Sequence, residues 1–94
     1  MNAVEVSHAC DELHRLIDQG PGPGTNPGAS ATSLTIIRQL RATAEWEYPL
    51  ELLNELERLI TRWFAGPVDR EQESRYALLE VISKIEDAWE RPRE

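Results

Sequence analysis

The chain has 94 residues, of which 40% are hydrophobic and 29% charged, a composition that is ordinary for a soluble globular domain. We therefore expect a single domain over residues 1–94. Seventeen acidic residues against ten basic ones give a formal net charge of −7. This charge argues against nucleic acid and anionic membranes as partners, because both are polyanions.

The cysteine content and the hydropathy pattern indicate a cellular location. Cys10 is the single cysteine, so the chain forms no internal disulfide, which suits a reducing compartment. The N-terminal residues include several acids and lack the apolar run of a signal peptide. No stretch approaches the ~20 apolar residues of a membrane-spanning helix. The sequence therefore predicts a cytoplasmic protein.

The first predicted helix covers residues 3–19, and a Gly/Pro-rich segment over residues 20–30 follows it. The apolar residues of this helix recur at intervals of three and four: Val6, Ala9, Cys10, Leu13, Leu16 and Ile17. The segment 20–30 is dominated by glycine and proline and is predicted to be a flexible loop. Eleven extended residues reach ~36 Å, whereas the helix is about 26 Å long. The loop is long enough to run back along the helix, so the direction of the second helix stays open.

The second predicted helix covers residues 32–47, with Ser30, Thr32 and Ser33 as alternative N-terminal caps. Pro49 disfavours helical geometry at the preceding residue, Tyr48. Either two helices meet at a tight corner there, or residues 32–65 form one kinked helix. We favour the corner.

The third predicted helix covers residues 50–65 and carries the densest apolar stripe of the chain: Leu52, Leu53, Leu56, Leu59, Ile60 and Trp63. Pro49 suits the first helical position, and Gly66 followed by Pro67 is a stop signal. The fourth predicted helix covers residues 69–90 and begins with Asp69 as its cap. Its inner face carries Leu78, Leu79, Ile82, Ile85 and Trp89.

These elements predict a small all-α four-helix bundle, in which the last two helices form an antiparallel hairpin. The apolar stripes of these two helices are broad for such a small core. A homodimer that buries a second apolar face is therefore an alternative to a monomer.

Cys10 and His14 lie one helical turn apart and form a candidate site for metal binding or thiol chemistry. Zinc needs two further ligands, which carboxylates would have to supply. A nucleophilic Cys10 would need His14 beside it, but a cysteine within the apolar stripe is buried, and burial makes a thiol inert. We therefore predict no catalytic residue, metal or cofactor. A metal-binding protein or thiol-dependent enzyme that uses Cys10 and His14 remains a further alternative.

The junction between the second and third predicted helices holds the richest acidic cluster, beside two aromatic residues. Tryptophan and tyrosine are frequent anchors at protein interfaces. We take five residues of this junction, the helix 2/3 corner, as the candidate partner-binding site: Trp46, Glu47, Tyr48, Glu51 and Glu55.

The sequence thus favours a non-catalytic protein–protein interaction module, meaning a small acidic adaptor, inhibitor, regulator or immunity-type protein. Its partner is expected to be a protein with a basic surface, attracted by the acids and anchored by the aromatic rings. A structural, self-assembling dimeric subunit is the alternative.

Overall fold

The structure is a computed structural model that describes residues 3–20, 22–45, 47–66 and 68–90. Its four helices are α1 (Ala3–Asp18), α2 (Pro27–Thr43), α3 (Glu47–Trp63) and α4 (Glu71–Glu90). There is no strand among the described residues. The predicted all-α four-helix bundle is therefore confirmed.

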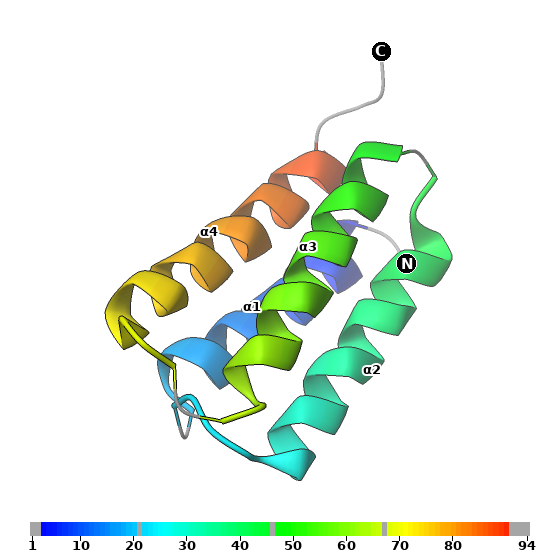
Figure 1. The fold of residues 1–94 in the computed structure, drawn as a ribbon. Coiled ribbons are helices and arrows are strands. Elements are labelled where there is room, and N and C mark those ends of the chain that lie inside the picture. The colour runs from blue at the N-terminus through cyan, green and yellow to red at the C-terminus, as the bar shows by residue number, and fades with distance from the viewer. Residues whose placement is uncertain (1–2, 21, 46, 67, 91–94) are drawn as a thin grey trace.

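The helices form a square in which each one contacts two neighbours. α1 packs against α2 and α4, and α3 packs against the same two helices, so the diagonal pairs lie apart throughout the described part of the chain. Consecutive helices run in opposite directions (Figure 1), which is the up–down–up–down order of simple bundles. The direction of α2, which the sequence left open, is therefore antiparallel to α1.

One hydrophobic core fills the centre of the square. All four helices contribute fully buried side chains to it, among them Val6, Leu13, Ile17, Ile37, Leu40, Leu53, Leu56, Ile60, Trp63, Leu78, Ile82 and Ile85. Removing one such side chain from water contributes about 1.5–3 kcal/mol. Leu52, Leu59 and Leu79 are only partly buried, at the edge of the core. None of the described helices is both long and apolar enough to cross a membrane.

The loop before α2 is shorter than the predicted 20–30, because the helix begins at Pro27 rather than at residue 32. The side chain of Asn26 accepts a hydrogen bond from the backbone N–H of Ala29 at 3.0 Å, so Asn26 is the N-cap. Pro27 occupies the first turn, where its missing N–H has no partner to lose. The sequence did not predict a helix start at Pro27, because glycine and proline, which are frequent in this segment, are typical of loops.

The corner between α2 and α3 is present, but it lies earlier in the chain than predicted. α2 ends at Thr43, because Ala44 has the extended dihedral angles φ −69° and ψ 126°. α3 begins at Glu47, and Pro49 is its third residue rather than its first. The first turn tolerates this proline, since the first N–H groups of a helix have no carbonyl partner within the helix.

The start of α4, after the turn that follows α3, also differs from the prediction. α4 begins at Glu71 and not at residue 69, because Arg70 adopts a left-handed φ of 54° that interrupts the helical geometry. Gln72, in the first turn of α4, donates a hydrogen bond to the hydroxyl of Tyr76 at 3.1 Å.

Two glycines fix the course of the loop between α1 and α2. Gly24 has a φ of 131°, and its N–H donates a hydrogen bond to the carbonyl of Trp63 at 2.8 Å, which ties the loop to the end of α3. Gly20 passes so close to α1 that a Cβ atom there would lie 2.0 Å from the carbonyl oxygen of Leu16. No other residue fits at Gly20 without movement of the backbone.

We expect the same substitution to have opposite effects at two glycines. Gly20→Ala should lower the free energy of unfolding by about 1–3 kcal/mol, because the new methyl group meets backbone. Gly28→Ala should raise it by about 0.5–1 kcal/mol, because Gly28 is helical and a Cβ atom there would make only an ordinary van der Waals contact, 3.7 Å from Oδ1 of Asn26. Urea unfolding followed by circular dichroism measures both changes. Equal effects of the two substitutions would contradict this account of the loop.

Candidate functional site

The predicted helix 2/3 corner lies on the first turns of α3, except for Trp46, which is outside the described residues. Glu47, Tyr48 and Glu51 are exposed, with Tyr48 retaining 44% of its surface, and Glu55 is half-buried. One side of α3 therefore presents these acids and the tyrosine ring together.

Arginines offset part of the acidic charge at this corner. Arg58 pairs with Glu55 at 2.7 Å within α3. Arg41 reaches from α2 to α3 and contacts Glu57 at 3.4 Å. The same guanidinium donates to the side-chain oxygen of Asn54 at 3.1 Å. The corner is therefore less acidic than the number of its glutamates indicates.

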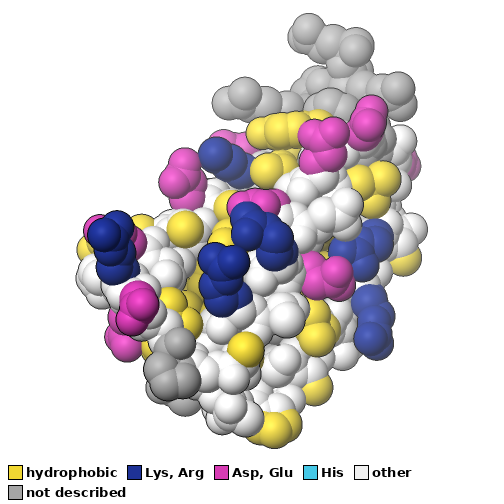
Figure 2. Space-filling view, viewed as in Figure 1, with side chains coloured by type: hydrophobic (Ala, Val, Ile, Leu, Met, Phe, Trp, Pro, Cys, Tyr) yellow, Lys and Arg dark blue, Asp and Glu magenta, His cyan; other side chains and the backbone are white. Residues whose placement is uncertain are grey.

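The net charge of the protein lies on the opposite pair of helices. α1 carries four acids and one arginine, and α4 carries six acids, one arginine and one lysine, so together they account for −7. α2 and α3 together carry four acids and four arginines, and the remaining segments are balanced as well. Figure 2 shows the side with α2 and α3, where basic side chains lie among acidic ones. The bundle thus has an acidic half and a neutral half.

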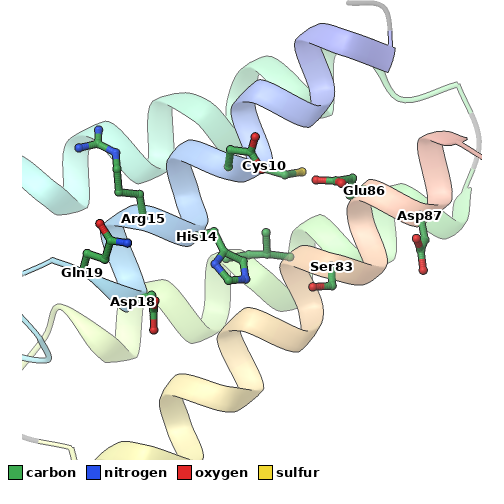
Figure 3. A pocket seen from close by; sticks show the side chains of 10 residues that line it. Cys10, His14, Arg15, Asp18, Gln19, Ser83, Glu86 and Asp87 are labelled. Atoms are coloured by element: carbon green, nitrogen blue, oxygen red, sulfur yellow. The ribbon is translucent and has the colours of Figure 1, made fainter.

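A groove of about 500 Å³ runs between α1 and α4. Four carboxylates line it, from both helices: Asp11, Asp18, Glu86 and Asp87. Figure 3 shows Asp18, Glu86 and Asp87 around the opening, with His14 and Ser83 between Asp18 and Asp87. Within the described residues, Asp11, Asp18 and Asp87 form no ion pair. Arg15 also borders the groove and pairs with Glu12 of α1, so the lining is predominantly acidic. A predominantly acidic hollow attracts cationic groups.

Cys10 and His14 both border this groove but differ in exposure. Cys10 is 1% exposed, as its place in the apolar stripe predicts, and His14 is exposed. The thiol points toward Glu86 (Figure 3). Burial, and then the negative charges of Glu86 and Asp11, raise the pKa of Cys10 to about 12. At neutral pH the thiolate that nucleophilic chemistry requires is therefore scarce.

Metal binding at this groove lacks support from the geometry. In the part of the chain that the structure describes, no three His, Cys, Asp or Glu side chains gather closely enough to hold a metal ion. The alternative that uses Cys10 and His14 therefore has neither a reactive thiol nor a formed ligand set.

The raised pKa of Cys10 predicts an inert thiol and a stability that falls at high pH. The unfolded chain ionises Cys10 above about pH 9 and the folded chain only near pH 12, so the unfolded state loses protons first. Wild type should lose up to about 1.4 kcal/mol per pH unit more than Cys10→Ala in this window. Thermal unfolding of both proteins from pH 8 to 11 measures this difference. Rapid labelling of native Cys10 by a thiol reagent at pH 8 would contradict it.

A smaller hollow of about 270 Å³ lies where α3 ends and α4 begins, beside the buried Trp63. The guanidinium of Arg75 lies 5.7 Å from the centre of the indole ring and pairs with Glu71 at 3.2 Å. The indole Nε1 and the Nε of Arg75 have no hydrogen-bond acceptor among the described residues. Both atoms are almost wholly screened from solvent, so they face protein rather than the hollow. We therefore assign this pair to packing of the two helices.

Comparison with protein-family models, curated proteins and solved structures finds no match to this chain. Its function must therefore be argued from its own surface. The sequence-based prediction named the acidic corner and missed the α1–α4 groove, whose two sides are about 70 residues apart in the chain. The net charge of each predicted helix would have pointed to this face, since the first and fourth helices carry the excess of acidic residues.

Proposed function

We propose that this protein is a non-catalytic protein–protein interaction module, an acidic adaptor, inhibitor or regulator, that binds a partner with a basic surface. The observation that carries the proposal is the location of the entire net charge on α1 and α4, on either side of a groove. Clustered like charges destabilise a protein by mutual repulsion, and a basic partner would relieve that repulsion. The reduced single thiol supports a cytoplasmic setting as part of this proposal.

The α1–α4 face is the stronger candidate for the docking surface. At the helix 2/3 corner, Glu55 and the neighbouring Glu57 already have arginine partners. In the groove, Asp11 of α1 and Asp87 of α4 are lining residues without a described ion-pair partner. Asp11 and Asp87 can therefore bind the arginines and lysines of a partner without first breaking an internal ion pair, whereas Glu12, Glu71 and Glu80 on the same two helices are paired.

A pull-down from nuclease-treated lysate at low and high salt, with three baits, tests both surfaces. We expect wild type to retain a stoichiometric basic protein at low salt and release it at high salt, because screening weakens exposed charge pairs. Asp11→Arg with Asp87→Arg should abolish this retention. Glu47→Arg with Glu51→Arg makes the same change in net charge at the corner and should leave retention largely intact.

The other outcomes are equally informative. Loss of the partner only in the corner variant would place the docking surface at Glu47, Tyr48 and Glu51 and reject the groove. Recovery of the bait alone at both salt concentrations would reject a basic partner. Circular dichroism of each bait confirms that the exposed substitutions leave the fold intact.

A further inference from the structure

The solvent-facing side of α3 carries a row of charges that is complementary to the same row on a second, antiparallel copy. Glu51, Glu55, Arg58 and Arg62 follow one another at intervals of four, three and four residues, so they form one stripe along the helix. The buried residues of α3 lie on the opposite side, with Leu56 near the middle. The stripe therefore has an acidic first half and a basic second half, and no other helix of the bundle covers it.

We propose that a second copy of this chain docks on this stripe, with the two α3 helices antiparallel across a twofold axis. In such a symmetric interface, residue i of one copy meets residue j of the other, and j meets i. A twofold axis that crosses α3 between residues 56 and 57 brings Glu55 opposite Arg58 of the second copy. The same axis brings Glu51 opposite Arg62. One geometry thus matches both pairs. Glu55 and Arg58 already pair within each copy at 2.7 Å, so the new ion pair of this contact is that between Glu51 and Arg62, which form no ion pair among the described residues.

The distribution of charge over the bundle favours this face for self-association. α2 and α3 together carry no net charge, so two copies can approach there without net repulsion. The acidic α1–α4 halves would face outward, separated by two bundles whose shorter dimensions are 23 and 19 Å. Charges so far apart are screened at physiological salt, where the Debye length is about 8 Å.

Apolar side chains adjoin the stripe and can add contact area. Tyr48, Leu52 and Leu59 each follow a charged residue on the α3 surface. Tyr48 is 44% exposed, and the two leucines are only partly buried against the core. A large apolar face for a dimer is otherwise missing, because the exposed large hydrophobic residues in the described ranges are Val4, Tyr48 and Tyr76, each on a different helix. The proposed contact therefore depends on charge pairing for its specificity.

Sedimentation equilibrium of the whole chain, with a charge-swap series, tests the proposal. Glu51→Arg and Arg62→Glu should each weaken dimerisation at least about tenfold, because each replaces two symmetry-related attractions by repulsions. The double variant Glu51→Arg/Arg62→Glu restores opposite charges across the axis and should return the dissociation constant to within about threefold of wild type. The two single variants change net charge in opposite directions, so a general charge effect cannot weaken both.

Glu80→Arg, an exposed reversal on α4, is the control and should leave dimerisation unchanged. A wild-type chain that stays monomeric at protein concentrations up to about 1 mM overturns the proposal. Single variants that associate as wild type does, or a double variant that fails to recover, also overturn it. The charge-swap variants leave Asp11 and Asp87 intact. The test of dimerisation is therefore independent of the test of partner binding at the α1–α4 groove.

Discussion

The burial of Trp63 holds together the end of the bundle where three segments meet. Its ring is 1% exposed, the guanidinium of Arg75 lies over it at 5.7 Å, and its carbonyl accepts the N–H of Gly24. One residue thus links α3, α4 and the loop that follows α1. The ring contact and the hydrogen bond contribute about 1 kcal/mol each, and burial of the indole contributes more.

The same packing separates the charges of the chain into two halves. The core decides which helices are neighbours, and it places α1 beside α4 and α2 beside α3. The acids of α1 and α4 then face one another, whereas Arg41 of α2 reaches Glu57 of α3. Repulsion in the acidic half lowers stability, and the shared apolar core offsets it. The two halves suit different contacts: a basic partner on one and a neutral, self-matching surface on the other.

Local sequence signals predicted which segments are helical better than where the helices begin. The spacing of apolar residues placed all four helices and most of the core, including Trp63 and Cys10. The starts were less certain, because proline and asparagine are typical of both loops and first turns. Asn26 and Pro27 therefore appeared to belong to a loop, and Pro49 appeared to be the first residue of its helix. The start of α2 depends on one capping hydrogen bond from Ala29 to Asn26, and that of α4 on one dihedral angle at Arg70, which a spacing pattern does not contain.

The sequence by itself determined the helical class, the single core, the burial of Cys10 and the charge that each helix carries. These properties follow from composition and from contacts within one helix, between residues three or four positions apart. Only the tertiary structure decided the direction of α2, the partner of Arg41 and the groove that brings Asp11 and Asp87 together. The physical reason is the flexible Gly/Pro-rich loop, which permits either direction of α2. Packing of the four apolar stripes, together with the bond from Gly24 to Trp63, selects one of them.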